Sequence, residues 1–522
     1  MIFLTNHVPV DSLRNRSSSG ESGYRSRKTM KKIKHEYILI IFATIFFVVY
    51  SYVSFTSPPK FVSPDEVANY FFTNLYSQSG ELSYSEDLNK IAQGIIHPRG
   101  TIYLDEKVVP QKFVGFSVIV GTVGIISPEA VRFVTPLLAV IGAIFLYLLV
   151  RDLFNSKIAL LSFLLLLIMP PYWYWSTLVM FENVAGCVLL IISLRYLFKL
   201  LDTNEPKYFL LSGLFLGLSL FIRPEHVLFF IPLFILFLWN RKKIKKTYMV
   251  LSALSAAIAL GPFFILNNEL YGSYLMTGQH IIYQWATTIP IRKFSMTNLF
   301  ENSFNFINLT PLLFLCGLLG LLYCIKKRIR LQYMVLLIVS LLVLSFYFLS
   351  GRTLPTDIHS SYVRYLLPVY MLSLSLISYL IISFREKFVG ILLILVMIMI
   401  NIFTVLPLIK NNLENVEYYA RLSSQVASVT EPDAVIFLDY CDKAIFPERR
   451  VGLVRELPEE NRCELLSEIA IRLSERNVPV YLLVSKEFEQ LIDYETLVKE
   501  LSVRKYGLTK TWFETLYELE KL

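Results

Sequence analysis

Two adjacent carboxylates follow the first long apolar run of the chain, in the stretch SPDEVANYFF at residues 63–72. Ser63, Pro64 and Glu66 have the spacing of a helix start, in which the serine caps the helix and the acid closes a capping box. Asp65 is then left beside the positive end of the helix dipole, which favours the ionised form that a general base requires. We therefore predict that Glu66 caps the helix and that Asp65 is available for proton transfer.

Other charged side chains lie at the ends of apolar runs. Arg223, in FIRPEH, falls in a link so short that its charge should face protein or a water-filled cavity rather than lipid. Glu182, in LVMFENVAG, is a lone acid in an apolar context and needs a cation or a cavity. A cation at a span end is also commonly a lipid-facing anchor, and that alternative stays open for each residue singly. Further polar candidates on this side are His97, Arg99, His280 and Arg364.

Carboxylates beside several cations suit group transfer from a lipid-linked phosphate. A carboxylate can remove the proton of an acceptor hydroxyl, and cations can bind a phosphate and stabilise it as it leaves. Because a phosphate is already a good leaving group, one base and a set of cations are sufficient. An apolar flank would hold the lipid chain of such a donor.

The composition indicates a membrane protein with many spans. Of 522 residues 55% are hydrophobic and only 17% are charged, and the mean hydropathy is +0.53. The net charge is +9, but residues 411–522 carry 21 acidic and 14 basic side chains, so the rest of the chain is strongly basic. Those basic residues lie in the first 36 residues and in short links between apolar runs. This distribution is typical of membrane topology and argues against a nucleic-acid partner.

The charges of the links predict how the chain crosses the membrane. Basic links such as RKKIKK (241–246) and KKRIR (326–330) fall on one side if eleven apolar runs cross in turn. This puts the N-terminus in the cytoplasm, and the first long loop (56–130) outside. If the run 113–127 also crossed the membrane, every later loop would change sides and RKKIKK would lie outside. We therefore expect this run to form a juxtamembrane or re-entrant helix on the outer face. The predicted spans are 37–55, 131–150, 157–172, 177–199, 207–222, 225–239, 248–266, 310–325, 332–350, 363–383 and 388–409.

Three regions follow from this pattern: a basic cytoplasmic tail (1–36) expected to be disordered, a membrane domain (37–410) and an extracytoplasmic domain (411–522). The last alternates strand, helix, strand and helix, with a final strand near Lys510–Leu519, which predicts a small α/β domain. Outside the cell its two cysteines, Cys441 and Cys463, either pair or remain as thiols. No zinc-type cysteine spacing exists.

Several segments, in order over about residues 37–410, resemble the GT-C fold glycosyltransferases of the protein O-mannosyltransferase and aminoarabinose-transferase type (family 39-like). The acid pair Asp65-Glu66 is followed by IIHPRG and VVPQKFVGFSVIVG, then by VRFVTPLLAVIGAIFLYLLVRDLF and STLVMFENVAG. GLFLGLSLFIRPEHVLFFIP, ELYGSYLMTGQH and SYVRYLLPVYMLSL complete the series. The chain departs from the family pattern at Tyr274, where proline is usual, and at Gln279-His280, where Gly-Tyr is usual. These departures leave the acceptor and the exact donor contacts open.

The resemblance implies a polytopic α-helical membrane protein of GT-C fold, with about eleven spans, outer juxtamembrane helices and a small C-terminal α/β domain. It implies transfer of a sugar, a hexose with mannose favoured, from a polyprenyl- or dolichyl-phosphate donor. The acceptor would be a hydroxyl of a protein, lipid or glycan at the outer face of the cell membrane, with inversion at the sugar carbon.

The resemblance also implies roles for single residues. Asp65 would be the base, with Glu66 beside it, and Glu182 would support the base or orient the acceptor. Donor-phosphate binding falls to Arg223 and Arg364, with His97, Arg99 and His280 as weaker candidates. The sequence requires no cofactor, although two acids could hold a divalent metal ion.

Three other classes remain as alternatives. A transporter or lipid flippase would share the many spans, but the charges gather at one face and no inverted repeats are seen. An oligosaccharyltransferase catalytic subunit would share the fold, but carries W-W-D-Y-G, which is missing here; Trp512 is the only tryptophan of the tail. The third is a structural or signalling protein whose working part is the tail; since the tail has neither a Gly-rich phosphate loop nor the spacing of a catalytic triad, we expect it to aid acceptor binding or stability instead.

Overall fold

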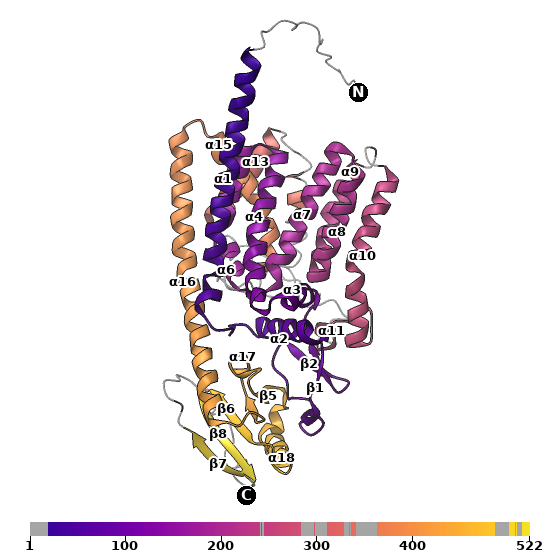
Figure 1. Ribbon diagram of the computed structural model, residues 1–522, viewed down its shortest axis with the longest axis vertical. Coiled ribbons are helices and arrows are strands. Elements are labelled where there is room, and N and C mark those ends of the chain that lie inside the picture. Colours follow the sequence, from indigo (N-terminus) through magenta and orange to yellow (C-terminus); the bar gives the residue numbers. More distant parts are fainter. Residues whose placement is uncertain are drawn as a thin grey trace.

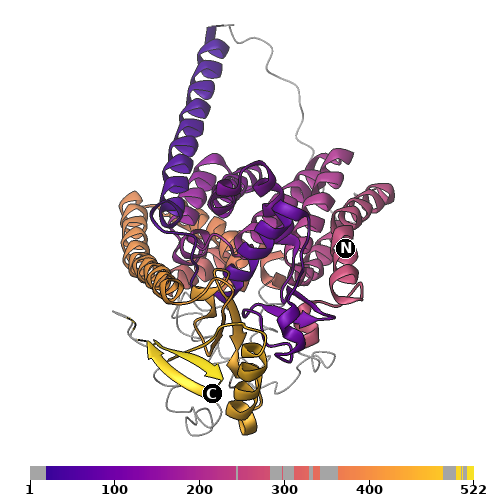
Figure 2. The ribbon, with the colours of Figure 1, turned by 60° about the horizontal axis from the view of Figure 1, so that its bottom comes forward.

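The computed structural model shows a bundle of long helices joined to a small domain that contains a sheet (Figure 1). The longest helix runs along one edge of the bundle and leads directly into that domain (Figures 1 and 2). The structure describes residues 19–240, 242, 245–282, 297, 311–327, 333–334, 336–340, 363–485, 501–506, 508 and 514–521.

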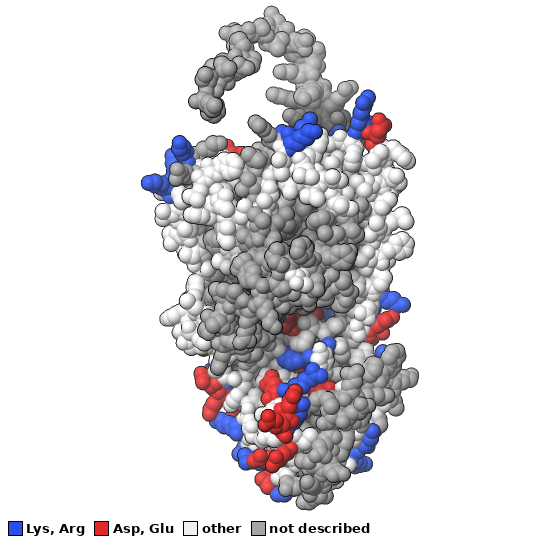
Figure 3. All heavy atoms as spheres, turned by 180° about the vertical axis from the view of Figure 1, so that it is seen from behind, with Lys and Arg blue, Asp and Glu red and all other residues white. Residues whose placement is uncertain are grey.

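Within the described residues, six helices are long and apolar enough to cross a membrane, and a bent pair forms a seventh span if counted as one. On the face shown in Figure 3, the charged side chains of the described residues gather near the two ends, and the described surface between them is largely uncharged. The six are α1 (Ser19–Thr56), α4 (Val134–Leu153, preceded by η2, Pro128–Phe133), α7 (Glu182–Thr203), α10 (Lys246–Tyr271), α15 (Leu367–Ser383, preceded by η5, Val363–Leu366) and α16 (Lys387–Val429).

Three predicted spans are shorter apolar helices in the structure, namely α8 (Pro206–Ile222), α9 (Phe230–Asn240, preceded by η3, Pro224–Phe229) and α13 (Pro311–Lys326). The predicted span 332–350 lies mostly outside the described residues. Helix α1 begins upstream of its predicted span, within the basic segment that we expected to be disordered.

The predicted span 157–172 is broken in the structure. Helix α5 (Ser156–Leu167) ends before Pro170-Pro171, and α6 (Pro170–Thr177) restarts at an angle of 55°. The residue before a proline avoids the helical conformation, and proline is well tolerated at the first helical position. Because of the break, α6 and its aromatic residues do not continue along the axis of α5.

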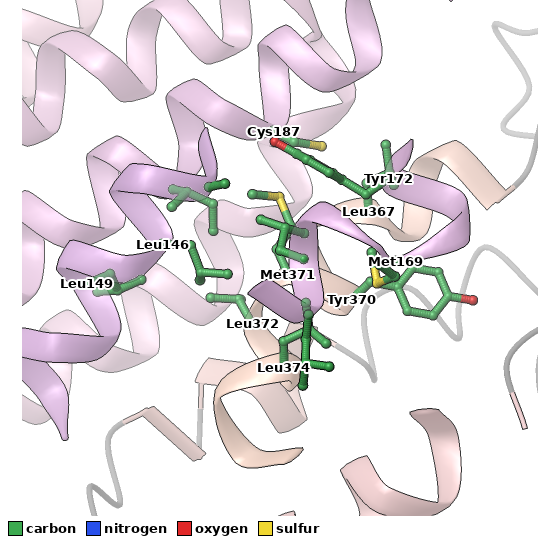
Figure 4. Close-up of a cluster of buried hydrophobic side chains, with 14 of the residues drawn as sticks. Leu146, Leu149, Met169, Tyr172, Cys187, Leu367, Tyr370, Met371, Leu372 and Leu374 are labelled. Atoms are coloured by element: carbon green, nitrogen blue, oxygen red, sulfur yellow. The ribbon is translucent and has the colours of Figure 1, made fainter. Parts of the chain in front are cut away.

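The apolar core lies where α4, α5, α6, α7 and α15 meet. Leu146, Tyr172, Cys187 and Met371, from four of these helices, pack together in Figure 4. Close contact of α8 with α10 depends on two glycines four residues apart. A methyl group at Gly213 would lie 2.1 Å from the Ser252 carbonyl oxygen, so the two backbones meet directly, as small residues allow in membrane bundles.

Two helices, α2 (Pro64–Ser79) and the apolar α3 (Gly115–Ile126), pack on each other between the bundle and the small domain (Figure 1). Helix α3 is the predicted juxtamembrane helix. Between them the chain forms η1 (Asp87–Lys90) and a three-stranded antiparallel sheet of order β1-β3-β2, from β1 (Tyr84–Ser85), β2 (Thr101–Leu104) and β3 (Lys107–Pro110).

The C-terminal domain is reached through α16, which continues without a break past the predicted boundary at residue 410. Its sheet has the order β5-β4-β6-β8-β7, with parallel pairing of β4 to β5 and β6, and antiparallel pairing elsewhere. Its elements are β4 (Val435–Leu438), α17 (Asp442–Ile445), β5 (Arg450–Leu453), η6 (Val454–Glu456), η7 (Glu459–Asn461), α18 (Arg462–Ser474), β6 (Val480–Ser485), β7 (Leu501–Tyr506) and β8 (Glu514–Lys521).

The predicted strand, helix, strand order and the last strand are present, and the second predicted helix lies outside the described residues. Within the described chain Cys441 and Cys463 form no disulfide, and they border different apolar clusters.

Candidate functional site

Helix α2 starts as its sequence indicates. The Ser63 hydroxyl accepts a hydrogen bond from the backbone N–H of Asp65 at 3.2 Å, and Pro64 occupies the first turn. Glu66 is 2% exposed, and its carboxyl accepts from the backbone N–H of Ser63 and, at 3.4 Å, from that of Met180. Glu66 therefore closes the capping box and also ties α2 to the segment before α7.

Asp65 forms ion pairs with two cations from distant parts of the chain. Lys112, which follows β3, contacts the Oδ2 atom of Asp65, and Arg364 of η5 places its Nη1 atom 3.6 Å from the same oxygen. The three side chains are 21%, 17% and 6% exposed respectively. Both cations therefore share one carboxylate in a setting where water screens them only partly.

The two neighbouring acids are held in different protonation states. Burial would raise the pKa of the Asp65 carboxyl, but the charges of Lys112 and Arg364 outweigh it and hold this pKa below its ordinary value. Burial, together with the nearby Asp65 carboxylate, raises the pKa of Glu66 to about 8, despite the hydrogen bond from Met180. At neutral pH Asp65 is ionised and Glu66 is protonated.

A second ion pair lies next to the first. Arg223, at the end of α8, and Glu182, the first residue of α7, are both almost fully buried, with Nη1 and Oε1 3.7 Å apart. Asn69 of α2 donates to the Met180 carbonyl oxygen at 2.8 Å and to the Glu182 carboxylate at 3.3 Å. The helix that carries Asp65 is thus linked by hydrogen bonds to the Glu182–Arg223 pair.

Aromatic rings connect the two guanidinium groups. The ring of Tyr365 lies 4.9 Å from the Arg223 guanidinium and 5.6 Å from that of Arg364, and Phe181 lies 5.2 Å from Arg364. Among the described residues, the buried Nε atom of Arg364 makes no hydrogen bond, and its Nη1 atom is the one that faces Asp65 at 3.6 Å. Arg364 therefore has its Nε donor left for an anion that enters beside Asp65.

The structure thus brings together five of the predicted site residues, Asp65, Glu66, Glu182, Arg223 and Arg364. Three others lie elsewhere. His97 pairs with Glu456 at 3.1 Å and Arg99 with Asp442, both at the contact with the C-terminal domain. His280, on the short helix α11 (Gly278–Ile282), is exposed and bonds to Thr277.

Two main contacts of this cluster had no predicted role: Lys112, which the sequence indicates only as one of several outer cations, and Asn69, which was not predicted. Lys112 had the same weak signal as every other outer cation, and nothing in its spacing links it to Asp65, 47 residues earlier. Asn69 stands four residues after Asp65, on the same face of a helix, and this spacing was the signal available for it.

Within the described part of the chain, no group of three or more His, Cys, Asp or Glu side chains is placed to hold a metal ion. Asp65 and Glu182 are instead paired with cations. A cavity of about 20 Å³ on the other side of Glu66 is bordered by Arg132 and Asn412 and not by Asp65, Lys112 or Arg364, and it has room for one water molecule.

The middle of the chain matches one known protein family. Residues 119–265 match the family described as dolichyl-phosphate-mannose-protein mannosyltransferase, a stretch that contains Glu182 and Arg223. No curated protein shows significant similarity to the chain.

Solved structures with a similar fold cover nearly all of the chain. ArnT from Cupriavidus metallidurans bound to undecaprenyl phosphate has a TM-score of 0.57 at 12% identity, over 92% of this chain and 97% of ArnT. The Archaeoglobus fulgidus oligosaccharyltransferase complex with zinc and sulfate scores 0.53 at 14% identity, over 91% of this chain and 72% of that protein. AglB of the same organism, in complex with an inhibitory peptide and a dolichol-phosphate, has a TM-score of 0.51 at 13% identity, over 94% of this chain and 74% of AglB. These likenesses confirm the predicted GT-C fold, with its multi-pass membrane domain and C-terminal domain.

Proposed function

We propose that this chain, a membrane glycosyltransferase of the GT-C fold and of the protein O-mannosyltransferase and ArnT type, moves a hexose from a polyprenyl- or dolichyl-phosphate donor to an acceptor hydroxyl. Mannose is the first candidate, since the matched family is described as using dolichyl-phosphate-mannose. The similar ArnT and AglB structures hold undecaprenyl phosphate and a dolichol-phosphate, which supports a donor of this class.

The observation that carries the proposal is the sharing of Asp65 by Lys112 and Arg364. A donor phosphate presents the same charge and acceptor oxygens as the carboxylate, so it competes for both cations. When Lys112 and Arg364 turn to the phosphate, they lower the pKa of Asp65 less strongly, and the Oδ2 atom of Asp65 becomes accessible. Donor binding would thereby convert an ion-paired carboxylate into a base.

The reaction then needs few groups. The Asp65 carboxylate takes the proton of the acceptor hydroxyl, and the hydroxyl oxygen forms a bond to the anomeric carbon from the face opposite the phosphate. The bond from that carbon to the phosphate oxygen breaks, and its electron pair stays on the phosphate, where Lys112 and Arg364 stabilise the charge. Attack from the opposite face inverts the sugar carbon. Glu182, Arg223 and Asn69 would hold α2 in place.

The outer membrane face is the proposed location. The N-terminal end of α1 and the C-terminal domain lie at opposite ends of the bundle. Helices α2 and α3 lie at the same end of the bundle as the C-terminal domain (Figure 1). Because the basic links are expected in the cytoplasm, Asp65 and the C-terminal domain would face outward.

The direct test uses membranes that contain the protein and a labelled polyprenyl-phosphate mannose. Asp65→Asn should lower the transfer rate at least about 100-fold, the usual share of a general base. Asp105→Asn is the matched control, because Asp105 is an exposed acid in a turn of the same outer loop, at a left-handed φ of 48° that asparagine tolerates. Equal rates in Asp65→Asn and wild type would exclude Asp65 as the base.

A further inference from the structure

The C-terminal domain grips the segment that leads into α2. Lys443 of α17 donates from its ammonium to the Val62 carbonyl oxygen at 2.7 Å. In the opposite direction, Lys60 donates to the Ala444 carbonyl oxygen at 2.7 Å and to the Glu448 carboxylate at 2.6 Å. The two lysines cross between the same two segments, so neither segment can shift alone.

A second contact holds the other side of α17. Asp442 is fully buried and accepts from both the backbone N–H (2.9 Å) and the Nε atom (2.7 Å) of Arg99. Gly100, which follows Arg99 in the chain, lies against the first turn of α2. A methyl group at Gly100 would be 3.1 Å from the Pro64 carbonyl oxygen and from the Ala68 side chain. Helix α17 therefore holds the start of α2 from two sides.

Burying the charges of this contact costs free energy, because each charge loses its hydration. Lys443 is 8% exposed, and burial, with the nearby Arg99 charge, lowers the pKa of its ammonium to about 8. An apolar residue would often stabilise such an interface equally well. What buried charged hydrogen bonds add is a fixed geometry. The point that they fix is the Val62 carbonyl, directly before the Ser63 cap and three residues before Asp65.

We infer that the clasp formed by Lys60, Arg99, Asp442 and Lys443 positions Asp65 for catalysis, so the C-terminal domain is a positioning element of the active site. This inference rests on the proposed role of Asp65. A base displaced by about 1 Å can cost about 100-fold in rate. The cations Lys112 and Arg364 lie outside the clasp, so donor binding should survive its loss.

The test uses the purified full-length protein and compares turnover with binding of polyprenyl phosphate. Lys443→Met and, separately, Asp442→Asn should lower kcat at least tenfold. Each should still bind one polyprenyl phosphate per chain, with a Kd within threefold of wild type, because the donor-binding cations remain in place. Lys443→Arg keeps a cationic donor and should recover part of kcat. Lys521→Met, which removes an exposed pair with Glu475 in the same domain, is the control and should behave as wild type.

Two results would overturn the inference. One is a kcat within twofold of wild type in both Lys443→Met and Asp442→Asn. The other is a fall in kcat that only matches a fall in the fraction of chains that bind polyprenyl phosphate, since that indicates unfolding and not misplacement. Asp65→Asn, measured in parallel, separates the two proposals: if it is fully active, the function assigned to Asp65 fails, whatever the clasp variants do.

Discussion

Replacement of Glu66 by glutamine tests the assignment of different protonation states to the two adjacent acids. Glu66 is buried and accepts hydrogen bonds from two backbone N–H groups, and its pKa is raised to about 8. Glutamine has the shape of the protonated acid, and its carbonyl oxygen can accept a backbone hydrogen bond as Oε1 does from Met180. Glu66→Gln should therefore preserve this contact with Met180 while removing the titration.

The magnitude follows from proton linkage. The folded protein keeps a proton on Glu66 up to a pH of about 8, whereas the unfolded chain releases it near the ordinary value of 4.5. The stabilising effect of the neutral acid is complete below pH 4.5 and is lost progressively as the pH rises to 8. At about 1.4 kcal/mol per pH unit, the loss at pH 7 is about 3 kcal/mol. Glu66→Gln should not lose this stability as the pH rises, because glutamine does not titrate.

The assay is thermal unfolding of the purified protein in detergent at several pH values from 5 to 8.5. The Tm of wild type should fall with rising pH relative to that of Glu66→Gln, and the variant should be more stable by a few degrees at pH 8. Its transfer rate should stay within threefold of wild type, since it replaces an acid that is already neutral. Parallel Tm curves would refute the raised pKa, and an Asp65→Asn-like loss of transfer would mean that the roles of Asp65 and Glu66 are reversed.

Two further predictions concern the cations around Asp65. Lys112→Gln should raise the donor KM about tenfold or more, because a hydrogen bond to a charged group is worth about 1.5–3 kcal/mol. The control is Lys90→Gln, which removes an exposed pair with Glu106 in the same loop. An unchanged KM in Lys112→Gln would contradict donor binding by Lys112. In pH–rate profiles, activity should be lost as the pH falls through the pKa of Asp65, at a lower pH for kcat/KM, which reports the free enzyme, than for kcat, which reports the donor complex. Coinciding acid limbs would show that the donor does not take the cations from Asp65.

The sequence by itself determined the features that depend on local chemistry and on the bilayer. Long apolar runs must become helices in a membrane because every backbone polar group has to be satisfied internally, and most predicted spans are apolar helices in the structure. The Ser63–Glu66 capping box needs only neighbouring residues, so its spacing predicted it. The break at Pro170-Pro171 was equally local, and the predicted span 157–172 ran through it because hydropathy alone was counted.

The tertiary structure alone decided which charges meet. Asp65, Lys112 and Arg364 come from three segments far apart in the chain, and a cation at a span end has the same sequence signal whether it faces lipid, an acid or a ligand. Arg99 shows the same limit, since it resembled a phosphate-binding residue and lies in the contact with Asp442 of the C-terminal domain. Ion pairing acts over a few ångströms in space and leaves no periodicity in the sequence, so the partners of each charge became known only when the helices were packed.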